Sequence, residues 1–163
     1  MINKSDRDKK IALLQQNLSS IRKIAGWTTE QLGEKIGVSK QTISNLENNK
    51  SPMNFTQYIA IRAILDYEIE ENKDNEVLAK VVDILLDHGD ELDEDNYQKV
   101  KSGIDTVAAA ASGGIAGAAL AGTFAGLVSP ILGLLGPVGV LGGAIAGATS
   151  SLWLKKLLKS KNK

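Results

Sequence analysis

The sequence feature that most constrains this chain is a run of consecutive residues, 106–154, that contains no charged side chain. The run is 49 residues long and holds eleven of the 16 glycines in the 163-residue chain. A helical domain in water needs a polar outer face, and this run offers only a few Ser and Thr side chains for one. The run is therefore expected to lie in surroundings different from those of the rest of the chain.

The length of the run fits two membrane-spanning helices. A helix that crosses the hydrocarbon core takes about 20 residues, and residues 106–128 and 131–154 provide 23 and 24. The second span has ten Leu, Ile, Phe or Val residues and the first has six, so the second is the stronger candidate. We expect a Gly/Ala-rich helical hairpin that spans the membrane, with its turn within 129–137, near one of the two prolines there.

Positive side chains at both ends of the run set the expected orientation. Lys99 and Lys101 precede it, and five lysines follow it between residues 155 and 163. Because Lys and Arg are concentrated in cytoplasmic flanks, we expect both termini on the cytoplasmic face of the inner or cell membrane. Trp153, Lys155 and Lys156 are the expected anchors at the membrane interface.

Small residues recur every four positions within the run. In lipid, rows of small residues let helix backbones approach closely. The spacing predicts that these rows pack the two helices against each other, or pack several copies of the chain as an oligomer. In composition alone, the pattern resembles glycine-zipper and colicin-like hydrophobic hairpins. The predicted packing residues are Gly114, Ala118, Gly122, Gly126, Gly139, Gly143 and Gly147.

The charged residues are divided into blocks along the chain. Residues 1–65 carry ten basic and five acidic side chains, whereas residues 66–105 carry four and 14, so the net charge of zero conceals modules with different surroundings. Apolar stripes predict two amphipathic helices after residue 70. The first, over 75–88, packs on the N-terminal bundle or on a second copy, and the second turns Tyr97, Val100, Ile104 and Val107 inward and runs into the uncharged block. The expected modules are a helical bundle over 1–70, an acidic helical connector over 71–102, the apolar hairpin over 103–154 and a basic tail over 155–163.

Composition argues against catalysis. The chain has no cysteine and a single histidine, His88, which removes thiol nucleophiles and most histidine-based catalytic and metal sites. The acidic run at 90–95 lacks the spacing of a calcium-binding loop, and the glycines at 113 and 114 lack the Lys and Ser/Thr of a phosphate-binding loop. We therefore expect no enzyme activity, no cofactor and no bound metal.

Residues 11–66 have the spacing of a small helical bundle. Apolar residues recur every three or four positions over 11–25, and Gly26 ends this first helix. Thr28 and Gln31 predict a capping box at the start of a second helix, and Gly37 supplies the backbone freedom that a tight turn requires. Ser39 is expected to cap a third helix.

The segment IRKIAGWTTEQLGEKIGVSKQTISNLENNKSP resembles the Cro/repressor-type (XRE-like) helix-turn-helix. The resemblance covers about residues 11–66 and implies an all-α domain in which the third helix enters the DNA major groove. It also implies that Arg22 and Glu47 form an internal salt bridge. Gly33 departs from the family, which prefers alanine there, at a helix cost of up to ~1 kcal/mol.

The same resemblance assigns roles in binding double-stranded DNA. With Ile43 and Leu46 facing inward on the third helix, the polar residues beside them form one outward face, and polar side chains of this kind can read base edges. The implied base-reading residues are Lys40, Gln41, Ser44 and Asn45. The implied DNA-phosphate contacts are Thr29, Ser39 and Lys50.

Three functions are compatible with these features. The first is a membrane-tethered, sequence-specific transcriptional regulator that has DNA, membrane lipid and further copies of itself as partners. The second is a membrane-active or pore-forming effector whose apolar hairpin is controlled by the N-terminal domain. The third is a soluble regulator that forms oligomers, at least dimers, through its apolar tail.

Overall fold

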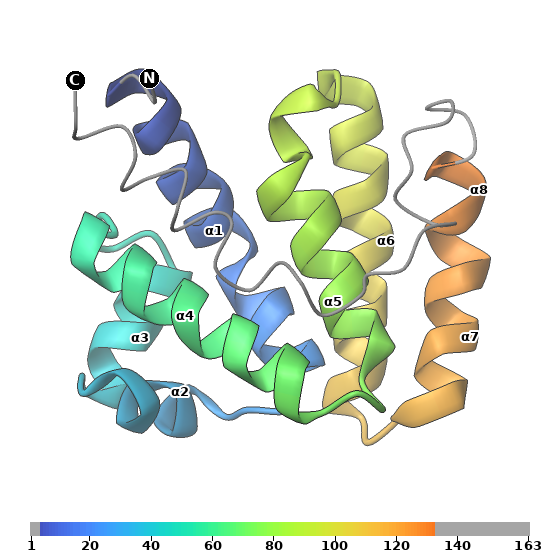
Figure 1. The fold of residues 1–163 in the computed structure, drawn as a ribbon, viewed down its shortest axis with the longest axis horizontal. Helices are drawn as coiled ribbons and strands as arrows, with labels where there is room; N and C mark the ends of the chain where they lie inside the picture. The colour runs from blue at the N-terminus through green and yellow to red at the C-terminus, as the bar shows by residue number, and fades with distance from the viewer. Residues whose placement is uncertain (1–3, 133–163) are drawn as a thin grey trace.

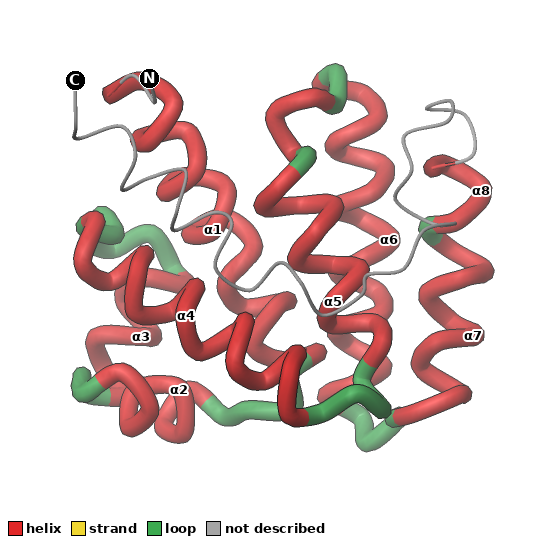
Figure 2. Tube along the Cα trace, in the orientation of Figure 1, coloured by secondary structure: helices red, strands yellow, loops and turns green. Residues whose placement is uncertain are grey.

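The computed structural model describes residues 4–132, and the regular structure within them is entirely helical (Figures 1 and 2). This confirms the all-α class. A π-helical turn, Asp83–Asp87, and a short 3-10 turn, Gly89–Glu91, connect the fifth and sixth α-helices. The α-helices are α1 (Lys4–Ile24), α2 (Thr29–Ile36), α3 (Lys40–Glu47), α4 (Phe55–Glu71), α5 (Glu76–Val82), α6 (Glu94–Ser112), α7 (Gly117–Leu127) and α8 (Ser129–Leu132).

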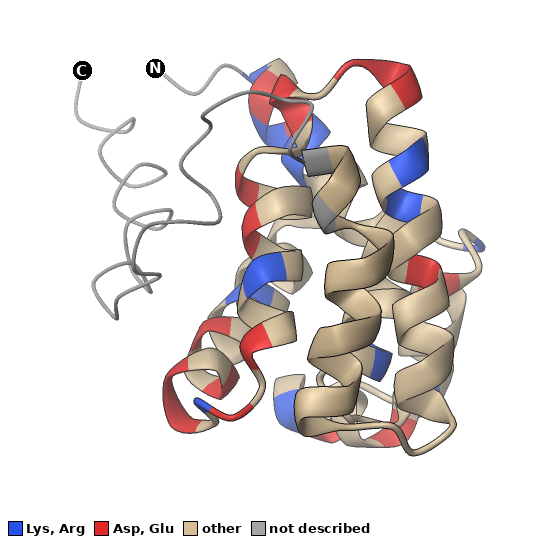
Figure 3. Cartoon of the chain, turned by 90° about the vertical axis from the view of Figure 1, so that its right-hand side faces the viewer, with Lys and Arg blue, Asp and Glu red and all other residues tan. Residues whose placement is uncertain are grey.

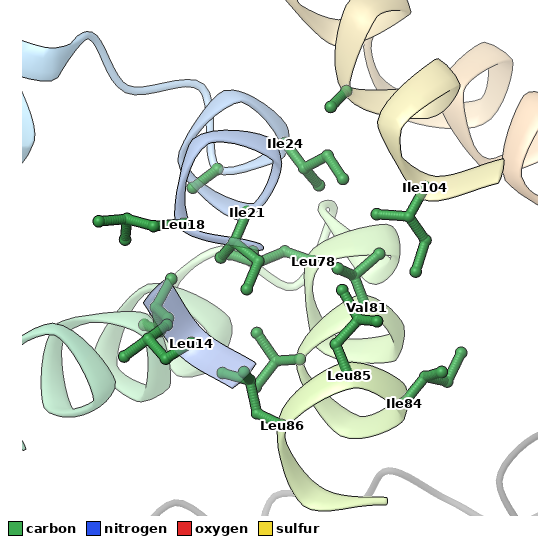
Figure 4. Packing of buried hydrophobic residues seen from close by; sticks show 14 of the residues in the cluster. Leu14, Leu18, Ile21, Ile24, Leu78, Val81, Ile84, Leu85, Leu86 and Ile104 are labelled. Atoms are coloured by element: carbon green, nitrogen blue, oxygen red, sulfur yellow. The ribbon is translucent and has the colours of Figure 1, made fainter. Parts of the chain in front are cut away.

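Helix α1 lies between the other helices and contacts α3, α4, α5 and α6. Its apolar stripe is formed by Leu14, Leu18, Ile21 and Ile24, all of which are buried. Figure 4 shows Ile21 of this stripe beside Leu78 of α5, whereas Leu18 points to the opposite side of α1. The apolar spacing over 11–25 predicted this helix, although the helix begins earlier, at Lys4.

The turns and caps of the N-terminal helices form as the sequence predicts. The Thr28 hydroxyl accepts a hydrogen bond from Gln31 N–H at 3.1 Å, and the Gln31 side chain accepts one from Thr28 N–H at 2.8 Å. Ser39 caps α3 by accepting from Thr42 N–H at 3.1 Å. Gly37 ends α2 in the left-handed conformation, with φ of 74°, which glycine adopts at no steric cost.

Gly33 is required by the close approach of α2 to the turn that follows it. A Cβ atom at this position would lie 2.7 Å from the carbonyl oxygen of Val38 and 3.3 Å from the carbonyl carbon of Ser39. Both are backbone atoms, so neither can move aside as a flexible side chain could. The glycine that departs from the family preference therefore has a steric reason in this chain.

The acidic segment after α4 packs against α1. The residues of its first apolar stripe, over 77–85, are buried, and so is the second stripe, which consists of Tyr97, Val100, Ile104 and Val107 on α6. The two predicted amphipathic helices are thus confirmed, and they lie against the N-terminal bundle of the same chain. Helix α6 also runs through the module boundary expected at residues 102 and 103.

Polar contacts fix α6 and α5 to α1 at defined positions. Asn17, which is 1% exposed, donates to the Tyr97 hydroxyl at 2.9 Å. The Ser20 hydroxyl donates to Asp105 at 2.6 Å. Asn75, the cap of α5, donates to the backbone carbonyl of Ile24 at 2.9 Å. Buried polar groups need partners, so these bonds specify how α5 and α6 align along α1.

The acidic residues around 93 act as helix-capping groups. Asp93 accepts from the backbone N–H of Asn96 at 2.9 Å and from its side chain at 2.7 Å, and Glu94 and Asp95 occupy the first turn of α6. The hydrogen bonds from Asn96 hold the pKa of Asp93 below its usual range. A helix N-terminus favours negative charge, which accounts for this part of the acidic run.

The first predicted membrane span, residues 106–128, is wrong as a single helix. Helix α6 ends at Ser112 and α7 begins at Gly117, with a turn between them in which Gly114 has φ of 93°. Helix α7 folds back onto α6 and α5, and Leu120, Phe124 and Val128 are buried there. Folding back removes these apolar side chains from water without a membrane.

Between residues 4 and 132, no helix combines the length and the hydropathy needed to cross a membrane. The second expected span lies almost entirely outside the described residues. So do the predicted interface anchors, Trp153, Lys155 and Lys156.

The structure describes part of the predicted row of packing residues, and this part does not lie between the described helices. Packing of the row against the second span or against another copy stays a prediction. Gly114 lies in the turn, and Ala118, Gly122 and Gly126 lie on the exposed side of α7. A Cβ atom at Gly122 or Gly126 would meet no described atom within 4 Å. The close helix approach occurs instead at Gly103, where a Cβ would lie 3.1 Å from Val128 Cγ2. The other members, Gly139, Gly143 and Gly147, lie outside the described residues.

Alanine at position 33 tests the steric role of this glycine. We expect Gly33→Ala to lower the free energy of unfolding by about 1–3 kcal/mol, the typical effect of overpacking, despite the higher helix propensity of alanine. The measurement is urea unfolding followed by circular dichroism. Gly122→Ala is the matched control, and it should raise the free energy of unfolding by up to about 1 kcal/mol. Equal stabilisation by both substitutions would contradict the steric reading.

Candidate nucleic-acid interface

Helix α3 has one buried face and one face open to solvent. Ile43 and Leu46 are fully buried, and they hold α3 against α1 and α2. The other face carries the four residues implied by the sequence resemblance. Lys40 and Gln41 are exposed, and Ser44 and Asn45 are half-buried. The structure therefore brings all four predicted base-reading residues together on the solvent-facing side of one helix.

Gln41 and Asn45 are joined to each other. The side-chain amide of Gln41 donates to the Asn45 side-chain oxygen at 2.9 Å, one helical turn apart. The Gln41 oxygen and the Asn45 amino group keep further hydrogen-bonding capacity. Gln and Asn side chains bond adenine through an acceptor and a donor held side by side. The hydrogen bond between the two side chains thus holds their remaining donors and acceptors in a defined position on the outward face of α3.

The three predicted phosphate contacts lie at helix ends and in a loop. Thr29 is the first residue of α2 and is half-buried, whereas Ser39, the cap of α3, is exposed. Lys50 is exposed in the loop between α3 and α4. Helix N-termini and lysine side chains both favour phosphate oxygens.

The backbone around Lys50 is shaped by the end of α3. Asn49 adopts the left-handed conformation, with φ of 54°, and its N–H donates to Leu46 O at 3.2 Å. The N–H of Lys50 donates to Asn45 O at 2.8 Å. This pair of bonds is a Schellman motif, which ends a helix and sets the direction of the chain beyond it. The lysine is therefore placed relative to the last turn of α3.

Arg22 and Glu47 form the internal salt bridge that the resemblance implies. The Nε and Nη2 atoms of Arg22 donate to the two carboxylate oxygens of Glu47 at 2.5 and 3.2 Å, and both side chains are about 10% exposed. Arg22 also donates to the backbone carbonyl of Trp27 at 2.7 Å. A two-pronged bond of this kind fixes orientation as well as distance, so it ties the C-terminal end of α3 to α1.

One residue with a place in this arrangement was missed in the sequence. Gln15 of α1 makes hydrogen bonds to the backbone on both sides of Lys50. The available signal was its position, four residues after Ile11 and three before Leu18, where an apolar side chain would continue the buried stripe. A polar residue at such a position needs a partner in the fold.

Charge is unevenly distributed over the described residues. Figure 3 shows charged residues on α6, and none on α7; the last charged residue of α6 is Asp105. No three metal-ligating side chains come together between residues 4 and 132. The outward face of α3 carries one ammonium, two amide groups and one hydroxyl, so its chemistry is hydrogen bonding and positive charge.

Comparison with known proteins points to the same segment. Residues 18–72 match the sequence profile of the helix-turn-helix family. Similar curated proteins include the antitoxin HipB of Escherichia coli strain K12 and that of E. coli O6:H1 strain CFT073. Each is 36% identical over 53 residues, which is 32% of this chain and 60% or 56% of the antitoxin.

The aligned region thus spans less than two thirds of the curated relatives it matches. The comparison with solved structures gave no match. The geometry of α2 and α3, the Arg22–Glu47 salt bridge and the family profile agree over one part of the chain. Residues 18–72 are an XRE-type helix-turn-helix domain.

Proposed function

We propose that the chain is a sequence-specific DNA-binding transcriptional regulator of the repressor type. The observation that carries the proposal is the outward face of α3, where Lys40, Gln41, Ser44 and Asn45 lie together opposite the buried face. In the helix-turn-helix fold this helix docks in the major groove. The excess of five positive charges over residues 1–65 favours a polyanionic partner.

Recognition would divide between base edges and the DNA backbone. The hydrogen-bonded pair Gln41 and Asn45 fits adenine, and Lys40 reaches guanine acceptors, each contact contributing roughly 1–3 kcal/mol of discrimination. Thr29, Ser39 and Lys50 would contact phosphates, which set the register of the protein on the duplex.

We further propose that the chain binds DNA as an oligomer, at least a dimer. A single short recognition helix reads few base pairs, and proteins of this fold pair two copies on half-sites about one helical turn apart. Sequences selected from a random DNA pool should then contain two copies of one short motif at a fixed spacing.

Membrane tethering is not part of this proposal, because residues 106–128 form two helices packed within the described fold. The role named for the two HipB relatives is that of an antitoxin. Their similarity to this chain covers 53 residues, which is 32% of it, so it supports a shared module rather than a shared partner.

Removing the amide pair should abolish sequence preference. We expect Gln41→Ala combined with Asn45→Ala to bring the affinity for a selected operator down to that for an unrelated duplex, while the melting temperature changes little. The measurement is a gel shift with both duplexes at one salt concentration. Because the two side chains bond each other, the changes in binding free energy caused by the two single substitutions should not add up to that of the double variant. The control is Gln98→Ala on the exposed side of α6.

Full operator preference in the double variant would refute the assignment of these two residues. Loss of binding to both duplexes together with loss of the helical signal would instead show that the double variant is unfolded. The operator preference of the two single variants would then decide whether these residues read the sequence.

Lys50 should contribute affinity without sequence preference. We expect Lys50→Ala to weaken binding to operator and unrelated duplex by the same factor, and to reduce the slope of log K against log salt by about 0.9. The measurement is a salt titration of binding by fluorescence anisotropy. Lys73→Ala, an exposed lysine between α4 and α5, is the matched control and should leave the slope unchanged. A change in the operator-to-unrelated ratio would contradict a phosphate role.

A further inference from the structure

One side chain of α1 satisfies three backbone groups around the loop that carries Lys50. Gln15 Nε2 donates to Leu46 O at 3.0 Å and to Ser51 O at 2.8 Å. Gln15 Oε1 accepts from Met53 N–H at 2.8 Å. The amide thus uses both its donor and its acceptor atoms on the backbone between α3 and α4.

The three backbone groups lie on both sides of Lys50. Leu46 is in the last turn of α3, whereas Ser51 and Met53 follow the lysine and flank Pro52. The Schellman motif fixes the backbone before Lys50. Gln15 fixes it afterwards, and it does so from a different helix. Hydrogen bonds on both sides of Lys50 in the sequence therefore fix the position of its backbone relative to α3.

The neighbouring contact strengthens this arrangement. Arg7, two turns earlier on α1, places its guanidinium 5.2 Å from the centre of the Phe55 ring. Phe55 is the first residue of α4, directly after the loop. Helix α1 therefore contacts the loop through Gln15 and the first residue of the next helix through Arg7.

Gln15 lies outside the segment that matches the family profile, which begins at residue 18. The contacts of Gln15 with the loop therefore come from outside the matched segment. Connecting loops are in general the most mobile parts of a fold. A loop that must present a lysine to a phosphate loses less freedom on binding if it is already held in place.

We propose that Gln15 is a positioning residue for DNA binding, which holds Lys50 where it contacts the DNA backbone. The proposal rests on the proposed function. Gln15 does not itself touch DNA, and its effect passes through the loop. Its removal should therefore weaken binding to all duplexes alike and leave sequence preference to the outward face of α3.

The test is a double-mutant cycle between positions 15 and 50 in the full chain. Gln15→Met keeps the length of the side chain and removes its hydrogen bonds. Lys50→Ala removes the charge. Gln16→Ala is the matched control, because Gln16 is an exposed glutamine on the same helix whose side chain only accepts a long bond, 3.4 Å, from Tyr97. Binding is measured on a duplex selected by the wild-type chain and on an unrelated duplex of equal length.

Both Gln15→Met and Lys50→Ala should make the slope of log K against log salt shallower by about 0.9. Between 1 M and 0.1 M salt, this difference in slope lowers the affinity of the variant relative to wild type by about eightfold. In the Lys50→Ala background, Gln15→Met should have little further effect on DNA affinity. Its effect on the melting temperature should be the same in both backgrounds. A residue that only stabilises the fold would not show this difference between the two measurements.

The outcomes separate the inference from the function on which it rests. If wild type binds the selected duplex and Lys50→Ala weakens it, but Gln15→Met binds like wild type, the positioning role is refuted and the function stands. The positioning role is also refuted if Gln15→Met lowers DNA affinity as much in the Lys50→Ala background as it does in the wild-type chain. If wild type shows no preference for any duplex, the proposed function fails.

A second variant covers a loss of folding. If Gln15→Met is not folded by circular dichroism, Gln15→Glu replaces it. Glutamate retains the acceptor for Met53 N–H but loses both donors to Leu46 O and Ser51 O. The same coupling to Lys50 is expected, and its absence overturns the proposal.

Discussion

The structure depends on the burial of α1 on more than one side. Its apolar stripe holds α3 and α4, and the same helix also supports α5 and α6. Burial of apolar surface is the main stabilising contribution in a fold of this size. Because α1 provides this buried surface for both halves, α3 and the later helices share a single hydrophobic core.

Polar contacts give this core its alignment. Arg22 and Glu47 fix α3 on α1, and Asn17 and Tyr97 fix α6 on the same helix. Arg62, which is 3% exposed, bonds both carboxylate oxygens of Asp87 at 2.7 and 2.8 Å and so joins α4 to the π-helical turn. Each of these bonds connects residues far apart in sequence, and buried polar groups tolerate few alternative arrangements.

The sequence predicts the elements that depend on local chemistry. The capping box of Thr28, the cap at Ser39 and the stripe of α6 all form as expected, because caps and helix period are set by neighbours in the chain. The break between α6 and α7 was not predicted, because an uncharged run fits a membrane and a protein core equally well. The role of Gln15 was also missed, since its partners lie more than thirty residues away. The predicted DNA contacts themselves remain predictions.

The sharing of α1 has a consequence for how the chain can be divided. The family profile ends at residue 72, so a fragment cut there would retain every helix of the recognition module. It would nevertheless expose the side of α1 that meets α5 and α6, and it would remove the hydrogen bonds that Asn17, Ser20 and the carbonyl of Ile24 make with those later helices. The helix-turn-helix domain is therefore only part of the packed core, and a fragment that keeps this core intact must include α5 and α6.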